Sequence, residues 1–332
     1  MFNKTDRLHK LRIGNDLSME EAHAIASDLL AGAIDTPQIV EILTLLQTKG
    51  ESVNEILGFI AAMREHMTPI AFEQSRLIDL CGTGGSLPNR FNASTCVALL
   101  LGKMGYPIVK HGNRGSKRAN GSIDFLDALA IPYDLSPANH QAQLNAMGAT
   151  FLFARLHHPA VRHAAEARKQ LSTRSIFNLI GPFCNPASPT TQIIGTTSSE
   201  LADTLLSVGQ QLAYETFAVI WSDIGLDECS TVGQSHAMIH QNGTTRTLTV
   251  DPTDYGIHHS LSDITVSKDA LAIDNANIFR DIITHQKTDH PLSALIALNA
   301  AVIMHIHEPS IPIQYGIKKA MQTLPLITLP TP

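Results

Sequence analysis

An apolar run followed by a glycine loop and a helix start is the feature that most constrains the fold of this chain. Residues 77–81 read as a buried strand, residues 82–85 form the loop, and residues 91–95 precede the apolar run 96–101. The free N–H groups and hydroxyls of such a helix start form a pocket for an anion. The segment therefore predicts a phosphate-bearing ligand, although a glycine loop can also serve as a plain strand-to-helix turn.

Short apolar runs alternate with helical stretches after Pro69. The strand candidates are residues 77–81, 106–109, 150–154, 192–196 and 216–221. Because helices separate these strands, the pattern predicts an α/β fold with a mainly parallel sheet that is covered on both faces. Ligands of such sheets bind at the carboxyl ends of the strands, and both the glycine loop and Lys110 fall there.

The amino-terminal part has a purely helical pattern. Ser18-Met19-Glu20-Glu21 is a capping box, and apolar residues such as Ile39, Ile42 and Leu46 recur at helical spacing. We therefore expect a small all-helical domain over residues 1–69, joined by a mid-chain helical segment near residues 168–185. The larger α/β domain would then span residues 70–332.

Composition and charge exclude several classes of protein. With 44% hydrophobic residues among 332, the chain can bury a large core and is not disordered. A net charge of -6 argues against an anionic membrane or a nucleic acid as the main partner. Residues 1–16 lack the apolar core of a signal peptide, and no run approaches the ~20 apolar residues of a membrane span, so we expect a cytoplasmic protein. The four cysteines show no paired spacing, which favours reduced thiols over disulfides or a zinc site.

Four further groups of residues follow the glycine loop in a fixed order. They are Lys110-His111-Gly112-Asn113-Arg114 with Gly121-Ser122, then His158-Pro159-Ala160 with Arg168, then Arg174 to Asn178 with Gly181-Pro182 and Asn185-Pro186, and finally Gly225-Leu226-Asp227-Glu228. In this order and spacing the chain resembles the anthranilate phosphoribosyltransferase family, part of the glycosyltransferase family that includes pyrimidine nucleoside phosphorylases. The resemblance covers about residues 15 to 310, nearly the whole chain.

The resemblance implies a reaction and its partners. Members of the family transfer the 5-phosphoribosyl group from phosphoribosyl pyrophosphate to anthranilate in tryptophan biosynthesis, with Mg2+ as cofactor. Their substrates lie in the cleft between the two domains, and the helical domain forms the contact of a homodimer. The same arrangement is the expectation for this chain.

The donor side of this reaction needs groups that neutralise a departing pyrophosphate. By resemblance, Lys110, Asp227 and Glu228 form the catalytic set, and the two carboxylates hold Mg2+ together with Ser94. The resemblance and the motifs assign donor binding to Gly82, Gly85, Ser86, Arg90, Asn92, Ser94, Thr95, Lys110, Lys117, Arg118 and Ser122. The alternatives are ordinary helix capping by residues 92–95, a solvated lysine at a strand end and a solvated turn at the acidic pair.

The acceptor side is assigned to Gly82, His111, Asn113, His158 and Arg168. Arg168 matches the arginine that faces the acceptor carboxylate in the family, and a guanidinium suits that planar partner. The alternative is an arginine on the surface of a helix. Neither histidine is assigned as a base, because the lone pair of an aromatic amine is free at neutral pH.

The sequence also departs from the family around the donor. Ser86-Leu87 stands where most members have Asp-Gly, and Lys117-Arg118 stands within a run that is usually rich in serine. Arg90 replaces a small polar residue and Arg155 replaces a proline. The departures leave two alternatives to the transferase: a relative that uses another acceptor, and a relative that binds nucleic acid through a basic patch of Arg90, Lys117 and Arg118. The retained acidic pair favours the enzyme, since a nucleic-acid binder has no evident use for it.

Overall fold

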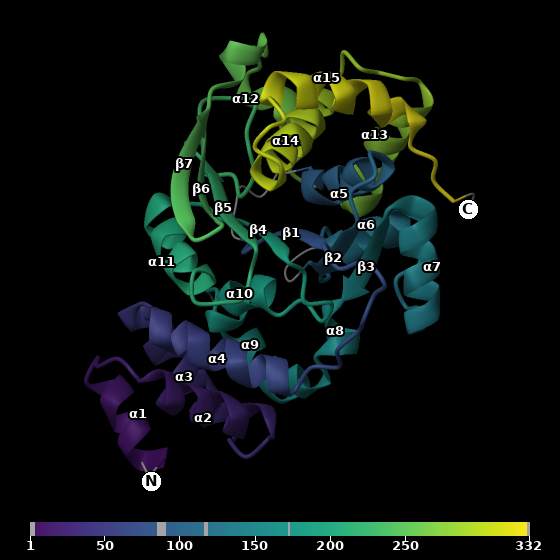
Figure 1. The fold of residues 1–332 in the computed structure, drawn as a ribbon. Coiled ribbons are helices and arrows are strands. Elements are labelled where there is room, and N and C mark those ends of the chain that lie inside the picture. Colours follow the sequence, from purple (N-terminus) through teal and green to yellow (C-terminus); the bar gives the residue numbers. More distant parts are fainter. Residues whose placement is uncertain (1–3, 85–90, 116–118, 172, 331–332) are drawn as a thin grey trace.

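A twisted sheet runs through the larger part of the molecule (Figure 1). The computed structural model describes residues 4–84, 91–115, 119–171 and 173–330, and within these ranges seven strands form one sheet in the order β3-β2-β1-β4-β5-β6-β7. The strands are β1 (Ile78–Gly82), β2 (Ile108–Gly112), β3 (Ala149–Phe153), β4 (Thr191–Gly195), β5 (Thr216–Ser222), β6 (Ser235–Gln241) and β7 (Thr244–Val250). Strands β1 to β5 are parallel, whereas β6 and β7 are antiparallel. The predicted α/β class with a mainly parallel sheet is therefore confirmed, and each predicted strand overlaps one of β1 to β5.

The hairpin of β6 and β7 was not predicted. Its turn consists of Asn242 and Gly243, with φ of 51° and 74°. Two successive residues with positive φ form the two-residue hairpin turn that asparagine and glycine favour. The Asn-Gly pair was thus a local signal for a hairpin, but the polar, exposed sequence of β7 gave no apolar run to accompany it.

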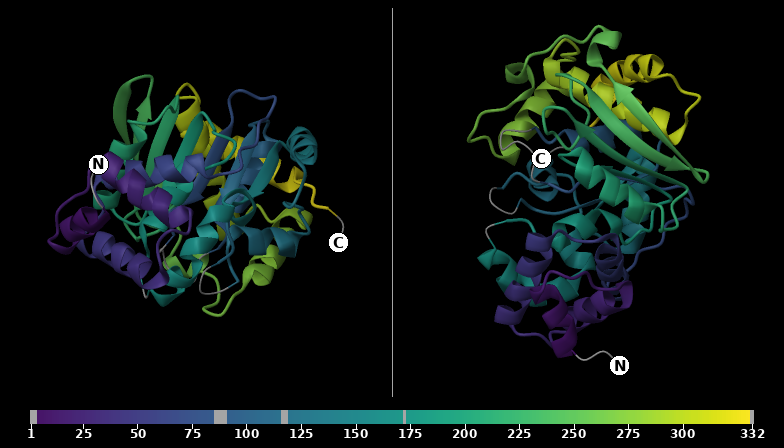
Figure 2. Two further views of the ribbon diagram at one scale, coloured as in Figure 1. Left: turned by 90° about the horizontal axis from the view of Figure 1, so that it is seen from below. Right: turned by 90° about the vertical axis from the view of Figure 1, so that its left-hand side faces the viewer.

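Helices cover both faces of the sheet (Figures 1 and 2). One face packs against a cluster built largely from α5 (Ala93–Lys103), α6 (Ser122–Leu129), α12 (Leu261–Ile264), α13 (Ala272–Thr284), α14 (Pro291–His307), α15 (Ile313–Thr323) and the turn η4 (Leu324–Leu326). The opposite side carries α7 (Pro137–Met147), α8 (Ala154–His157), α10 (Ile176–Ile180), η2 (Gly181–Phe183) and α11 (Ser199–Gly209). A short turn, η3 (Pro252–Tyr255), follows β7.

The helical part lies at the end of the molecule opposite α12 and α15 (Figure 1 and the right-hand view of Figure 2). It contains α1 (Lys4–Arg12), α2 (Met19–Leu30), α3 (Thr36–Lys49) and α4 (Val53–Glu65), and the mid-chain segments η1 (Pro159–Ala164) and α9 (Ala165–Gln170) pack against α2 and α3. The Ser18 capping box at the start of α2 is present as predicted. None of the described helices has the length and apolar character that crossing a bilayer requires.

The helical part and the sheet share one apolar cluster. Phe59 of α4, Phe177 of α10 and Phe217 of β5 all belong to it. Arg64 of α4 donates from Nε and Nη2 to the carbonyl of Phe183, at 3.1 and 2.8 Å. The boundary between residues 69 and 70 stays a prediction, since the core itself is continuous across it.

Candidate functional site

The end of strand β2 presents neighbouring residues to opposite faces of the sheet. Ile108 belongs to the cluster beneath α5 and α14, whereas Val109 packs against Leu144 of α7 on the other face. The alternation of a strand then places Lys110 on the α5 face and His111 on the opposite face. The residues predicted for the donor and for the acceptor thus lie at the same end of the strands, on opposite faces of the sheet.

The acidic pair lies in the segment that follows β5. Gly225, with φ of 76°, and a hydrogen bond of 3.0 Å from Leu226 N to Ser222 Oγ form the turn that brings Asp227 back over the sheet. A Cβ atom on Gly82 would lie 2.0 Å from Asp227 Oδ2, and one on Gly195 would lie 1.8 Å from the Asp227 carbonyl oxygen. Both strand ends must therefore be glycine for the acidic segment to sit there.

Asn299 of α14 holds the backbone next to the acidic pair. Cys229 N donates to Asn299 Oδ1, and Asn299 Nδ2 donates to the Cys229 carbonyl, both at 2.8 Å. Sequence reasoning missed Asn299 and Gly195. The signal for Asn299 was a lone amide within the apolar sequence of α14, because a buried amide of this kind needs polar partners.

Glu228 lies close to the start of α5. Burial first, and then the charge of Glu228, raise the pKa of the Cys96 thiol well above its ordinary value. Ser94, two residues before Cys96, is half-buried in the same helical turn. Two carboxylates and a hydroxyl are the oxygen ligands that suit Mg2+, which binds few protein groups and retains water or substrate phosphates. The described residues contain no group of three or more histidine, cysteine and acidic side chains of the kind that would hold zinc.

The amino end of α5 is not closed by its own N-cap residue. Asn92 makes no side-chain capping bond. Its Nδ2 donates to the Asn120 carbonyl at 3.1 Å, and its Oδ1 accepts from Asn275 at 2.7 Å. Thr95 Oγ1 is buried, with no hydrogen-bond partner among the described residues. The Asn92 side chain therefore does not cap α5, which was the alternative to a ligand pocket.

Asp124 holds the described residues that follow β2 and precede α6. The Asp124 carboxylate accepts from Gly115 N at 2.8 Å and from Gly121 N at 2.9 Å, and it pairs with Arg114 at 2.8 Å. Ser122, the first residue of α6, donates from Oγ to the Asn113 carbonyl at 3.3 Å. The Asn120 carbonyl, next to Gly121, accepts from Asn92 at the start of α5.

Lys110 is buried at 3% exposure, so it is not a solvated surface lysine. Its Nζ donates to the Leu80 carbonyl at 2.6 Å. Burial raises the pKa of the fully buried Asp79, and the charge of Lys110 offsets part of that rise. Asp79 also accepts from His111 N at 3.2 Å, which ties the two neighbouring strands at the edge of the site.

His111 and His158 pack together, with ring centroids 5.1 Å apart. Burial lowers the pKa of His111 well below its ordinary value and lowers that of His158 to about 4. His158 Nε2 lies 2.9 Å from the Cys184 carbonyl, to which it donates when neutral. Both rings are therefore uncharged at neutral pH. The remaining nitrogens, His111 Nε2 and His158 Nδ1, are buried with no partner in the described part of the chain.

Arg168 is half-buried and lies over the ring of Phe177, 5.2 Å from the ring centroid. Burial lowers its pKa, and the charge of Arg155 lowers it further. Within the described ranges, no carboxylate lies within ion-pair distance of Arg168. Asn113 is exposed and accepts from Arg114 N at 2.8 Å. A half-buried guanidinium beside an aromatic ring fits an anion-binding role better than that of an exposed arginine on a helix surface.

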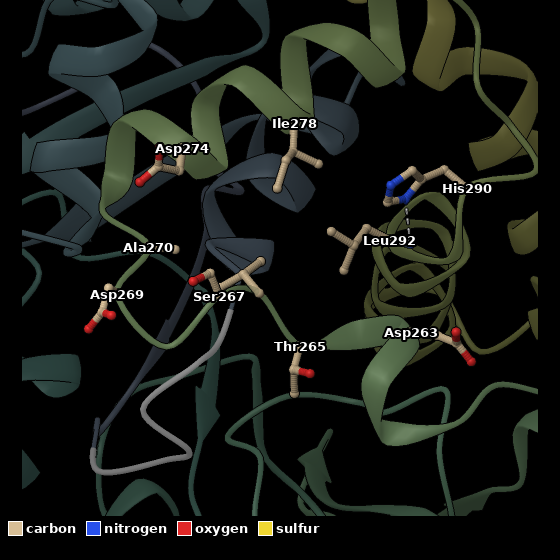
Figure 3. Close-up of a pocket in the computed structure, with 10 residues that line it drawn as sticks. Asp263, Thr265, Ser267, Asp269, Ala270, Asp274, Ile278, His290 and Leu292 are labelled. Carbon is tan, nitrogen blue, oxygen red and sulfur yellow. Dashed lines mark hydrogen bonds between the residues drawn. The ribbon is translucent and has the colours of Figure 1, made fainter.

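Six predicted residues, Gly85, Ser86, Leu87, Arg90, Lys117 and Arg118, lie outside the described residues. A cavity of about 540 Å³ that was not predicted lies beside α13, where Ser267, Asp274 and His290 line it (Figure 3). It is near the donor side, because Ala272 N at the start of α13 donates to the Ala119 carbonyl at 3.1 Å.

Comparison with known proteins covers almost the whole chain. Residues 5–67 match the helical bundle domain of the glycosyl transferase family, and residues 74–325 match its α/β domain. An anthranilate phosphoribosyltransferase from Rhodopirellula baltica is 35% identical over 90% of this chain and 86% of its own length. One from Methanocorpusculum labreanum is also 35% identical, over 96% and 92%.

Solved structures agree in fold. The anthranilate phosphoribosyltransferase from Thermus thermophilus superposes with a TM-score of 0.85 and 29% identity, covering 96% of this chain and 94% of that one. The enzyme from Saccharomyces cerevisiae, solved in complex with phosphoribosyl pyrophosphate and Mg, superposes with a TM-score of 0.84 at 21% identity, over 97% and 94%. At that identity the second likeness concerns the fold alone. Together, the two matched domains and the relatives at 35% identity show that this chain belongs to the glycosyl transferase family, among the anthranilate phosphoribosyltransferases.

Proposed function

We propose that this chain transfers the 5-phosphoribosyl group from phosphoribosyl pyrophosphate to the amine of anthranilate, in tryptophan biosynthesis and with Mg2+. The proposal depends mainly on the position of the acidic pair. Asp227 packs against Gly82 and Gly195 at the ends of two strands, close to the start of α5, where the N-cap side chain makes no capping bond. An anion pocket and a carboxylate pair on one face of the sheet suit a diphosphate donor that binds with a metal ion.

In the proposed reaction the bond from ribose C1 to the pyrophosphate oxygen breaks and a bond from the anthranilate nitrogen to C1 forms. The amine then loses a proton to water. Asp227, Glu228 and Ser94 would hold Mg2+, which supplies positive charge to the departing pyrophosphate when it is bound. The amides and hydroxyls at residues 92–95 and at Ser122 bind the phosphates of the donor and orient its ribose.

Lys110 is proposed as a second source of positive charge on the donor face. Its ammonium group is already desolvated and its hydrogen bond goes to a neutral carbonyl. A phosphate oxygen is a stronger acceptor than that carbonyl, because a charged pair forms shorter and stronger hydrogen bonds. Donor binding would therefore draw Nζ away from Leu80.

The acceptor is proposed to enter on the opposite face, next to the helical part. Arg168 pairs with its carboxylate, while Asn113 and the uncharged His111 and His158 offer hydrogen bonds to its polar edge. Neutral rings suit an aromatic acid, since they neither repel Arg168 nor protonate the amine. Gly82, at the strand end between the two faces, leaves room for the Asp227 carboxylate.

We further propose a homodimer through the helical part. Ile13 and Met19 expose 57% and 40% of their surfaces there, and apolar side chains at such a place are suited to a contact with a second copy. Light scattering on the wild type and on Ile13→Lys tests this: a dimer that becomes a monomer supports it, and a wild type that is monomeric at all concentrations contradicts it.

The transfer reaction is tested by incubating the purified chain with phosphoribosyl pyrophosphate, Mg2+ and anthranilate and following the loss of anthranilate fluorescence. We expect turnover that requires all three components and falls with chelation of the metal. A flat trace with anthranilate but transfer to another aromatic acid would point to a different acceptor. A flat trace with salt-sensitive binding to single-stranded DNA would favour the nucleic-acid alternative and overturn the proposal.

A further inference from the structure

Helix α13 joins the two segments assigned to the donor. Asn275 of α13 is fully buried, and its Nδ2 donates to Asn92 Oδ1 at 2.7 Å and to Asn120 Oδ1 at 3.2 Å. Asn92 in turn donates to the Asn120 carbonyl at 3.1 Å. Asp274 and Ile278 of the same helix line the cavity in Figure 3, so α13 contacts both the cavity and the donor segments.

The bond from Asn275 explains why Asn92 leaves α5 uncapped. An N-cap asparagine ordinarily accepts from the amide two or three residues further on. In this chain Ser18, Asp35 and Ser136 accept such bonds in their own helices, whereas Asn92 does not. Its oxygen is held by Asn275 instead. The amides of Ala93 and Ser94 thus remain available to a ligand, whereas Thr95 N donates to the Asn92 carbonyl at 3.2 Å.

We propose that Asn275 is a positioning residue of the donor site: by holding the Asn92 side chain and the segment at Asn120, it keeps the amino end of α5 open for the phosphates of phosphoribosyl pyrophosphate. The inference rests on the proposed function and adds a residue to it from a distant part of the chain. Asn275 does not touch the donor. It acts through Asn92.

Loss of Asn275 would release a competitor for the phosphates. The freed Asn92 oxygen can turn and accept from the amide of Ser94, and it can compete with the Asn92 carbonyl for the amide of Thr95, as N-cap side chains do. That bond stabilises α5 and occupies the donors that a phosphate oxygen needs. A purely structural role predicts the reverse pattern: a less stable protein with unchanged kinetic constants.

Two substitutions separate the effects. Asn275→Leu removes the hydrogen bonds to Asn92 and Asn120 at similar size, and Asn275→Asp keeps the shape but removes the donor group. In Asn275→Asp the Asn92 amide can bond again only by turning over, which breaks its bond to the Asn120 carbonyl. Both variants should therefore raise the KM for phosphoribosyl pyrophosphate by about 10- to 100-fold, the range for lost buried hydrogen bonds. The KM for anthranilate at saturating donor should stay near that of the wild type.

Ser293→Ala is the matched control. Ser293 is also fully buried in the carboxyl-terminal helices and donates to the Lys287 carbonyl at 2.8 Å, but it has no hydrogen bond to the described residues of either donor segment. We expect a lower melting temperature without a change in either KM. Equal donor KM values for Asn275→Leu, Asn275→Asp and Ser293→Ala would overturn the inference.

A double variant tests the route through Asn92. If Asn275 acts through Asn92, then Asn275→Leu should weaken donor binding much less in an Asn92→Ala background than in the wild type, because the competing oxygen is already gone. Losses that simply add would contradict the inference. If the wild type transfers the phosphoribosyl group normally and Asn275→Leu has the same donor KM as the wild type, then this inference alone is refuted. A wild type with no transfer and no donor binding refutes the proposed function and the inference together.

Discussion

The contact between Gly82 and the acidic segment makes Gly82→Ala the most informative single substitution. The new methyl carbon would lie 2.0 Å from Asp227 Oδ2, whereas real Cβ atoms stay at least 3.0 Å from such neighbours. The carboxylate must therefore retreat by about 1 Å, because the backbone of β1 is fixed on both sides by β2 and β4. A displacement of that size in a group that positions the reaction costs about 100-fold in rate.

We expect kcat/KM of Gly82→Ala to fall about 100-fold in the fluorescence assay for anthranilate consumption. Crowding of the site should also lower the free energy of unfolding by about 1 to 3 kcal/mol. Urea denaturation measures this second quantity and shows whether the variant is folded under assay conditions.

Gly209→Ala is the matched control for crowding. Its Cβ would lie 2.2 Å from a ring carbon of Phe217 in the core, so it should destabilise the chain to a similar degree. Its kcat/KM should match that of the wild type once folded protein is counted. In the double variant Gly82→Ala with Asp227→Ala, stability should recover while activity stays lost, since the clash has been removed together with the carboxylate. Near-normal kcat/KM for folded Gly82→Ala would refute the placement of Asp227 in the reaction.

Three further predictions concern the two faces of the site. Asp227→Asn or Glu228→Gln should lower turnover at saturating Mg2+ by about 100-fold or more with little change in melting temperature, and normal turnover in the double variant would contradict the metal assignment. Arg168→Ala should raise the KM for anthranilate while donor binding measured by calorimetry without anthranilate is unchanged; an equal loss of donor affinity would assign Arg168 elsewhere. The pKa of His158, about 4 when folded against about 6.5 when unfolded, means that the unfolded chain binds the extra proton, so stability is full above pH 6.5 and falls as the pH drops toward 4. Between pH 8 and pH 5, protonation of this group lowers the free energy of unfolding by about 2 kcal/mol. In His158→Gln the amide can still donate to the Cys184 carbonyl, but nothing titrates. Denaturant titrations at the two pH values should therefore show that the variant loses about 2 kcal/mol less stability than the wild type.

The Asn275 bonds give the donor site a long-range dependence. Asn92 and Asn120, which accept from Asn275, lie 183 and 155 residues away in the chain. Asn299 holds the acidic segment from α14 in the same way, 70 residues from Cys229. Helices α13 and α14 are therefore more than a cover for the sheet, since each contributes a buried amide that fixes the backbone or side chains at the site.

The local sequence determined the elements of this protein. The Ser18 capping box, the five parallel strands and the glycine loop before α5 were all readable, because helix caps, strand alternation and turns depend on residues within a few positions of one another. The Asn242-Gly243 turn was equally local and could have predicted the hairpin.

Only the tertiary structure decided how those elements serve the site. Lys110 is buried because other segments pack over β2, and the sequence around it was compatible with either a solvated or a buried lysine. That Asn92 leaves α5 uncapped follows from Asn275, and that Asp227 lies over the sheet requires glycine at both Gly82 and Gly195. The physical reason is that an asparagine, a glycine or a lysine has the same local preferences wherever it stands, while its hydrogen-bond partners and its exposure are set by segments that only folding brings together.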